Sequence, residues 1–507
     1  MPKKMRPIPA TMATQHPDNA FPPYWEKKGD GFISVHEELD ECVACFRDLN
    51  VGEFMWDWEG KYADEAVIDK LFSNHYETFR KLHIGKDKFL TFRLPNIWQE
   101  KGYSLLRALM VILTSEDFAR DLKFHSPPLF EVILPMTEKA EQLIYIQKSF
   151  QKLATFKSEN FNHERTKNTD LVEIIPLVEG TESQVGVGEL LHEYVSLYRK
   201  NFGGKPAYIR PFLARSDPAL VSGLIATILA NKIALSELTQ FSRKTKIPVY
   251  PIIGAGSLIF RGGLNPDNIK NFLAEYAGIR TVTIQSAFRY DYPLPLVKRT
   301  LNHLDARLSE REAQVIPSQD QEFLCTIINK STKVYQSTLG KLIKDMDPFF
   351  RAVPRRRERR QHIGLLSYSR KMGRHPVPRA INFTAAFYSI GVPPEFIGLG
   401  RTLKGLSFKE LDRLSKYYVN FKTDLMNAGR YINHENLRKL AQSNPDWKLI
   451  EEDIALTGHI LDLDLGPKTK NDLLHQNLTA SLLLQRKNKR VVSELIVASG
   501  KLRKSLG

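Results

Sequence analysis

The chain has 507 residues, of which 42% are hydrophobic, so it can bury one very large core or two to three ordinary ones. It contains no run of about eighteen or more apolar residues and no signal-peptide core, so we expect a cytoplasmic protein without membrane contacts. The formal charge of +16 favours anionic partners: nucleic acid, acidic surfaces, or small phosphorylated and carboxylated substrates.

Short apolar, β-branched stretches alternate with helical patterns along most of the chain. The candidate strands are residues 53–58, 88–93, 129–134, 172–178, 207–213, 248–253, 280–285 and 362–367. Strands that alternate with helices favour a parallel sheet, and about eight of them suffice to close a β/α barrel. We therefore predict an α/β fold, an elaborated (β/α)8 TIM-type barrel whose core spans approximately residues 50–400.

The helical patterns predict additions around this barrel. Ser216 and Pro218 favour the start of a helix that continues through residues 219–229. Residues 294–360 and 403–507 are also helical in pattern, and no glycine- or proline-rich linker divides the chain, so residues 1–507 are expected to form a single catalytic domain. Cys42 and Cys45 fall within an amphipathic helix at residues 35–46, which indicates buried structural thiols in a reducing compartment.

Barrel enzymes carry their reactive groups just beyond the C-terminal ends of the strands. In this chain those positions hold the charged or polar residues Arg93, Glu179, Asp217, Arg261 and Gln285. Two carboxylates on neighbouring strand ends, Glu179 and Asp217, could share one Mg²⁺ ion and leave coordination sites for water and substrate. Glu182 is a rival to Glu179, and a capping group with a surface charge is the alternative interpretation of the pair.

A glycine-rich stretch, residues 254–263, follows the sixth candidate strand and has neither Walker nor dinucleotide-binding spacing. Its glycines, which include Gly262 and Gly263, would let backbone amides approach an anion, and Arg261 could bind a phosphate or carboxylate through two parallel hydrogen bonds. The alternative is a tight turn with a solvated arginine.

Three further residues are candidates for the site. His16, which Pro17 follows, suits proton transfer near neutral pH, although a structural histidine is the alternative. Arg370 and Arg379 lie in an arginine-rich segment that could capture anions or remain on the surface.

Two basic runs occur, at residues 354–362 and 485–490. Neither is interleaved with the aromatic side chains that stack on single-stranded bases, and no helix-turn-helix or zinc-finger spacing surrounds them. We therefore expect no nucleic-acid partner, although a basic nucleic-acid-binding protein remains the alternative from another functional class.

In their order along the chain, these segments resemble the phosphoenolpyruvate carboxylase family, and its compact archaeal type more closely than the long bacterial and plant type. Thr14-Gln-His16-Pro-Asp is similar to the family's Thr-Ala-His-Pro-Thr segment, which carries the essential histidine. The acidic residues of Leu177-Val-Glu179 and Arg215-Ser-Asp217 resemble those that hold the metal. Further similar segments are Phe92-Arg93, Phe260-Arg261-Gly-Gly263, Thr283-Ile-Gln285-Ser, Ser369-Arg370, Pro378-Arg379 and Ser505-Leu-Gly507.

The resemblance implies an enzyme that forms oxaloacetate and phosphate from phosphoenolpyruvate and bicarbonate, through carboxyphosphate and the enolate of pyruvate. It implies Mg²⁺, or Mn²⁺, on Glu179 and Asp217, and it implies a homotetramer. Catalytic roles fall to His16, Arg261 and Arg370, and substrate binding falls to Arg93, Gly262, Gly263, Gln285 and Arg379.

Two positions depart from the long type. Ala255 stands where the first loop arginine would be, and Leu220 stands where a lysine would be. A different magnesium-dependent barrel lyase or transferase that acts on the same carbon skeleton is the nearest alternative function.

Overall fold

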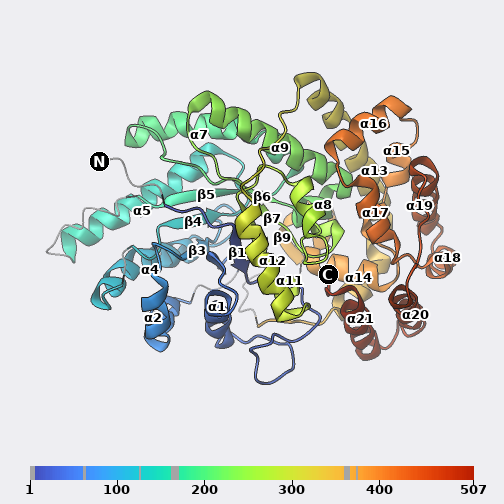
Figure 1. The fold of residues 1–507 in the computed structure, drawn as a ribbon, viewed down its shortest axis with the longest axis horizontal. Helices are drawn as coiled ribbons and strands as arrows, with labels where there is room; N and C mark the ends of the chain where they lie inside the picture. The colour runs from blue at the N-terminus through green and yellow to red at the C-terminus, as the bar shows by residue number, and fades with distance from the viewer. Residues whose placement is uncertain (1–5, 61–63, 125–126, 162–170, 359–365, 373–374) are drawn as a thin grey trace.

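The fold of this computed structural model is a closed barrel of eight parallel strands with helices packed around it and a large helical region on one side (Figure 1). The structure describes residues 6–60, 64–124, 127–161, 171–358, 366–372 and 375–507, with the side chains of residues 366–376 left outside the description. Each strand pairs with the next along the chain, and β8 pairs with β1 to close the barrel. The strands are β1 (Thr11–Thr14), β2 (Glu53–Asp57), β3 (Phe89–Arg93), β4 (Glu131–Leu134), β5 (Glu173–Val178), β6 (Phe212–Ala214), β7 (Ile252–Gly254) and β8 (Thr281–Ile284).

The barrel interior has three layers because alternate residues of each strand point inward. On β2 these are Glu53, Met55 and Asp57, which are all buried. Met55 belongs to an apolar cluster in the barrel interior with Met12, Ile133, Ile175, Leu177, Phe212, Ala214 and Ile252. Because every second residue of a strand points inward, an ionic layer lies on the N-terminal side of these apolar residues, and polar side chains lie on their C-terminal side.

The ionic layer at the N-terminal end of the barrel is centred on Arg210. Its guanidinium donates to Glu53 Oε2 at 2.7 Å, to Glu131 Oε2 at 2.6 Å and to Thr281 Oγ1 at 3.1 Å. All four residues are at most 2% exposed. Because every charge here has an opposite partner, this layer seals the barrel floor and leaves the other end for chemistry.

The helices that follow the barrel strands bury apolar faces against the outside of the barrel, where most of the first large core cluster lies. They are α1 (Glu37–Arg47), α2 (Val67–Asn74), α3 (Tyr76–Leu82), α4 (Gly102–Asp121), α5 (Ala140–Asn160), α6 (Thr181–Val185), α7 (Val187–Phe202), α8 (Ser216–Ser222), α9 (Leu224–Thr245), α10 (Ile269–Glu275), α11 (Ser286–Tyr290) and α12 (Leu294–Arg307). The predicted helix around Cys42 and Cys45 is α1, in which both free thiols are buried.

The C-terminal helices gather on one side of the barrel and surround a second core cluster (Figure 1). They are α13 (Ser318–Ala352), α14 (Ala380–Ser389), α15 (Leu399–Leu403), α16 (Phe408–Tyr417), α17 (Phe421–Gly429), α18 (His434–Ser443), α19 (Lys448–Leu461), α20 (Lys470–Leu484) and α21 (Lys489–Arg503). Short 3-10 helices η1 (Ile259–Arg261), η2 (Pro394–Phe396) and η3 (Pro445–Trp447) and a two-stranded sheet of β9 (Leu366–Met372) and β10 (His375–Pro378) complete the described elements. None of the described helices combines the length and the apolar character that crossing a membrane requires.

The structure corrects the prediction of which segments form the barrel. The barrel begins at β1 and ends at β8, so it spans Thr11–Ile284 and not residues 50–400. The predicted strand at 362–367 lies mostly outside the described residues, and its last two residues belong to β9, which pairs antiparallel with β10. β1 escaped prediction because its four residues, Thr-Met-Ala-Thr, contain no aliphatic run even though all of them are buried.

The helix predicted at 219–229 is divided into α8 and α9 at Gly223, which has φ +85°. Tyr335 of α13 explains the break. A Cβ at position 223 would lie 2.9 Å from the Tyr335 ring, and the Tyr335 hydroxyl donates to the Leu220 carbonyl at 3.0 Å. The division therefore lets α13 pack closely against the barrel just after Asp217.

Candidate active site

A cavity of about 1320 Å³ lies at the C-terminal ends of the barrel strands. Side chains at or just beyond these ends line it, and the opposite wall is formed by residues 350–357, the start of α14 and the start of α21. The lining includes the predicted site residues His16, Arg93, Glu179, Asp217, Arg261, Gln285 and Arg379. The structure thus brings these seven residues together, although they are spread over more than 360 positions of the sequence (379 − 16 = 363).

His16 lies two residues beyond β1, and its position follows from the barrel closure. Its Nδ1 is 2.8 Å from the Thr14 hydroxyl oxygen, and its backbone carbonyl accepts from the Ser286 N–H at the start of α11. The ring is half-buried and faces the cavity. The Thr14 hydroxyl fixes the orientation of the ring, and an imidazole at the cavity wall can exchange a proton with a bound molecule near neutral pH.

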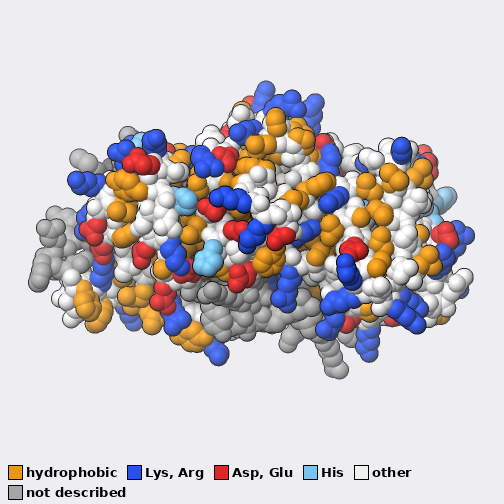
Figure 2. Space-filling model, turned by 90° about the horizontal axis from the view of Figure 1, so that it is seen from below, with side chains coloured by type: hydrophobic (Ala, Val, Ile, Leu, Met, Phe, Trp, Pro, Cys, Tyr) orange, Lys and Arg blue, Asp and Glu red, His pale blue; other side chains and the backbone are white. Residues whose placement is uncertain are grey.

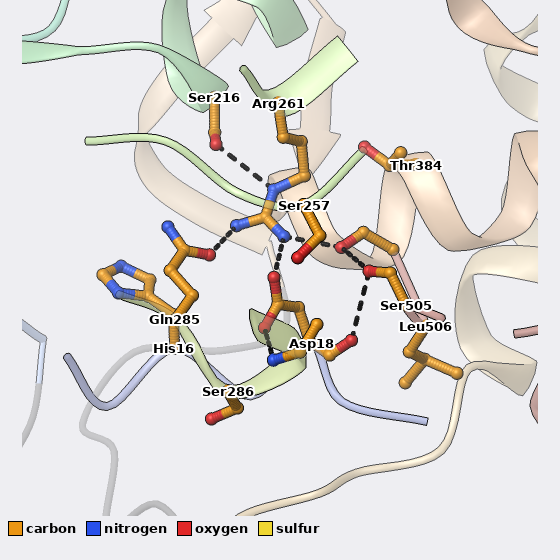
Figure 3. Close-up of polar contacts among 12 residues, drawn as sticks. His16, Asp18, Ser216, Ser257, Arg261, Gln285, Ser286, Thr384, Ser505 and Leu506 are labelled. Atoms are coloured by element: carbon orange, nitrogen blue, oxygen red, sulfur yellow. Dashed lines mark hydrogen bonds and ion pairs between the residues drawn. The ribbon is translucent and has the colours of Figure 1, made fainter. Parts of the chain in front are cut away.

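Arg261 is buried and is held by four hydrogen bonds (Figure 3). Its Nε donates to Ser216 Oγ at 3.2 Å, and its Nη2 donates to Gln285 Oε1 at 2.5 Å. Its Nη1 donates to Asp18 Oδ2 at 3.0 Å and to the Gly507 oxygen at 2.5 Å. An arginine has five N–H donors, so the protein fixes this guanidinium in place and leaves about one donor for a ligand. Arg261 therefore supplies a fixed positive charge and not the two parallel hydrogen bonds to an anion that the sequence predicted.

Asp18 joins four segments beside Arg261. Its Oδ1 accepts from the Ala287 N–H at 2.7 Å, and its backbone carbonyl accepts from the Leu506 N–H at 2.7 Å. Figure 3 shows Asp18 between Arg261 and the Ser505–Leu506 segment. The loop after β1, η1, α11 and the last residues of the sequence therefore meet at one buried residue, Asp18.

Gly507 occupies a position that accepts no side chain. It is fully buried, and a Cβ there would lie 2.7 Å from Ala385 N and would also collide with the Ile381 carbonyl. Only glycine can bring its backbone oxygen to Arg261 in this place.

Two carboxylates from neighbouring strands face the cavity. Glu179 follows β5 and Asp217 follows β6, and both are half-buried. Their rival Glu182 is exposed on α6, and among the described lining residues it does not occur. No group of three or more His, Cys, Asp or Glu side chains suited to a metal is found among the described residues. Two oxygen donors fit Mg²⁺, which commonly binds through one or two carboxylates and keeps water or phosphate oxygens as its other ligands.

Arg93 is paired with two acidic residues that the sequence analysis did not select. Its Nη2 lies 2.8 Å from Asp57 Oδ2, and its Nη1 lies 2.8 Å from Glu59 Oε2. Burial opposes the charge of Arg93, but these carboxylates more than offset it and hold its pKa well above the usual value. Burial lowers the pKa of the neighbouring Arg379, against the attraction of the same two carboxylates.

Both basic runs of the sequence reach this cavity. Arg355 and Arg356 of the first run and Lys489 and Arg490, the last two residues of the second, line the cavity. Arg357 is buried and pairs with Glu38 and Glu41 of α1. On the face shown in Figure 2, Lys and Arg are interspersed with Asp and Glu and do not form one continuous stripe. The excess cations of these two runs are therefore placed at the cavity, where they would attract anions.

Three predicted residues have other positions. Gly262 and Gly263 have φ +123° and +71°, so they are required by the turn after η1, and within the described part of the chain they do not line the cavity. Arg370 lies on β9, whose side chains are outside the described part, so its catalytic role stays a prediction.

The sequence analysis missed Asp18, Asp57, Glu59 and Ser216 as site residues. Asp57 could have been found, because it lies one residue before the end of the predicted strand at 53–58 and reactive groups of barrel enzymes lie at strand ends. Glu59 lies two residues further along the chain and points to the same cavity. The sequence around Asp18 gave no comparable signal, because the contacts of Asp18 come from three segments that are distant along the chain.

Comparisons with known proteins give the family of this chain. The family model described as phosphoenolpyruvate carboxylase matches residues 8–507. Proteins named phosphoenolpyruvate carboxylase from Leuconostoc mesenteroides and Oenococcus oeni are 46% and 47% identical to this chain, over 99% and 94% of both chains. One of the same name from Metallosphaera sedula is 36% identical over 99% of this chain and 100% of its own. The relatives have the same compact length, and the chain belongs to the phosphoenolpyruvate carboxylase family in its compact, archaeal type.

Proposed function

We propose that this cavity carboxylates phosphoenolpyruvate with bicarbonate to give oxaloacetate and phosphate. The observation that carries the proposal is the single cavity that collects a half-buried histidine, two carboxylates on adjacent strands and several guanidiniums at the C-terminal end of a barrel. Both substrates are anions, and the reaction needs their negative charges brought together. Fixed cations lower the cost of that approach.

Each group of site residues would have its own role in the reaction. Arg93, Arg261 and Arg379, with Gln285 and predicted Arg370, would hold the phosphate and carboxylate groups so that a bicarbonate oxygen attacks phosphorus in line. The bond from phosphorus to the enol oxygen then breaks, which gives carboxyphosphate and the enolate of pyruvate. Gly262 and Gly263 would support substrate binding by shaping the loop that carries Arg261.

His16 would act next as a general base. It takes the proton of carboxyphosphate, whose C–O bond then breaks to release carbon dioxide and phosphate. The enolate carbon bonds to carbon dioxide and forms oxaloacetate. The His16 ring suits this step because the Thr14 hydroxyl holds Nδ1 and the ring lines the cavity.

Glu179 and Asp217 would hold the divalent cation, Mg²⁺ or Mn²⁺. When bound, the cation would supply Lewis-acid stabilisation of phosphate and enolate oxygens. We further propose that the whole chain is one catalytic domain, since two residues of the C-terminal region take part in the site: Arg379 lines the cavity, and Gly507 accepts a hydrogen bond from the lining residue Arg261.

We also propose a cytoplasmic homotetramer. The exposed apolar side chains of Phe408 and Leu484, 85% and 75% exposed, are of the kind that subunit contacts cover. Light scattering of the purified protein measures the mass that tests the tetramer.

A coupled assay tests the activity. Purified protein is incubated with phosphoenolpyruvate, with and without bicarbonate and Mg²⁺, while oxaloacetate and phosphate are measured separately. We expect both products in equal amounts, and only with bicarbonate and the cation. Phosphate release that is independent of bicarbonate would indicate the alternative, another lyase or transferase that acts on phosphoenolpyruvate.

A further inference from the structure

The main chain of Phe260, directly before Arg261, is held by charged side chains at both its N–H and its carbonyl. Its N–H donates to Glu395 Oε1 at 2.8 Å, and its carbonyl accepts from Arg215 Nη1 at 3.3 Å. The Phe260 ring stacks on Phe383 of α14 with centroids 5.6 Å apart. The conformation of the residue that leads into Arg261 is thus set from outside its own loop.

Glu395 lies on η2, in the C-terminal helical region, and is 1% exposed. Its Oε1 also accepts from the Tyr388 hydroxyl at 2.5 Å. Its Oε2 has no hydrogen-bond partner among the described residues. A buried carboxylate with one unsatisfied oxygen lowers stability, and a glutamine would make the same two contacts without the charge. Such a cost is typical of residues retained for function.

We propose that Glu395 is a positioning residue for the carboxylation, which acts through the Phe260 peptide to fix Arg261 in the cavity. The inference rests on the proposed function and adds a residue that neither lines the cavity nor belongs to the barrel. It also gives the helical region a direct part in the geometry of the site. An ionised carboxylate forms stronger hydrogen bonds than a neutral one, so its charge strengthens the contact.

The charge state of Glu395 is set by its surroundings. Burial raises its pKa to about 7, against the hydrogen bonds from Tyr388 and Phe260 and the charge of Arg215. The ionisable groups that act on it or respond to it are Arg215 at the end of β6, Tyr388 of α14, Tyr335 of α13 and Asp424 of α17. The carboxylate is therefore largely ionised at pH 8 and largely protonated at pH 6.

The contribution of Glu395 to stability changes with pH in the opposite direction to its contribution to catalysis. Between the usual glutamate pKa and about 7, the folded protein keeps a proton on Glu395 that the unfolded chain has released. The contribution of Glu395 to stability is therefore present at low pH and is lost as pH rises toward 7. We expect Glu395→Gln to have a higher melting temperature than the wild type at pH 8 and a similar one at pH 5.

The experiment compares Glu395→Gln and Glu395→Ala with the wild type from pH 6 to pH 8.5. Alanine removes both contacts, so kcat should fall roughly 10- to 100-fold, because a displaced catalytic group costs that much. Glutamine keeps the contacts but lacks the charge, so its kcat at pH 8 should lie roughly two- to fivefold below that of the wild type. The wild-type to Glu395→Gln ratio of kcat should approach one at pH 6, where both side chains are neutral. Taking the ratio cancels the titration of all shared groups.

Asp472→Ala is the matched control for a purely structural loss. Asp472 caps α20 and pairs with Arg430, and we expect this variant to melt earlier with an unchanged kcat. The proposal is overturned if Glu395→Ala keeps wild-type kcat, or if the wild-type to Glu395→Gln ratio is constant with pH. A wild-type protein that makes no oxaloacetate would instead refute the proposed function, so the two failures are distinguishable.

Discussion

Replacing Asp18 by asparagine tests how strongly Arg261 depends on its ion pair. The two carboxylate oxygens accept from Ala287 N at 2.7 Å and from Arg261 Nη1 at 3.0 Å. Asparagine offers one acceptor and one donor, so in either orientation an NH₂ group faces an N–H group. Removing one partner of a buried ion pair costs about 3–5 kcal/mol of stability. Gly507, Gln285 and Ser216 still hold Arg261, so we expect the lower end of this range.

The same change should reduce kcat/KM about 100-fold, since Arg261 loses its fixed position. That factor corresponds to about 2.7 kcal/mol of transition-state stabilisation. The coupled oxaloacetate assay measures it in a double-mutant cycle with Arg261→Met. If Asp18 acts through Arg261, adding Asp18→Asn to Arg261→Met should cost less than about threefold.

Asp291→Asn is the matched control for this cycle. Asp291 is also a buried carboxylate that accepts two backbone N–H groups, those of Ala20 and Phe21 at 2.7 and 2.8 Å. It makes no hydrogen bond to Arg261 within the described structure, so its effect should multiply with that of Arg261→Met. Multiplication of the Asp18→Asn and Arg261→Met effects would refute the reasoning.

Three more changes test other parts of the site. His16→Asn should leave part of the bicarbonate-dependent phosphate release intact and abolish oxaloacetate, and separate product assays would contradict the proton-transfer role if both are lost equally. Gly507→Ala should lower kcat roughly 10- to 100-fold because its Cβ has no space beside Ala385, and wild-type activity would show that this contact is dispensable. Replacing Lys489 and Arg490 by serine should lower kcat/KM roughly three- to tenfold at low ionic strength, and kcat/KM of the variant should equal that of the wild type in about 0.5 M salt. A difference in kcat/KM that does not change with salt would exclude electrostatic attraction of the substrates by these two residues.

The fold class was predictable because seven of the barrel strands lie in short stretches rich in apolar or β-branched residues, and these stretches alternate with helical patterns. β1 could not be found in this way, since its burial results from pairing with β2 and β8 and leaves little trace in four residues. Strand-end chemistry located Glu179, Asp217 and Gln285 because strand and site are adjacent in sequence. Asp18 and Glu395 act on Arg261 across more than 130 residues, and only the folded chain shows such contacts.

The closure of the barrel by β1 and β8 has a consequence for biosynthesis. Thr11 of β1 pairs with Val282 of β8, so about 270 further residues must be synthesised before the second edge of β1 has a partner strand. At translation rates of roughly 5–20 residues per second, this delay is roughly 15 to 50 seconds. During that time one edge of β1 has no partner strand, and an unpaired edge of this kind can pair with another chain.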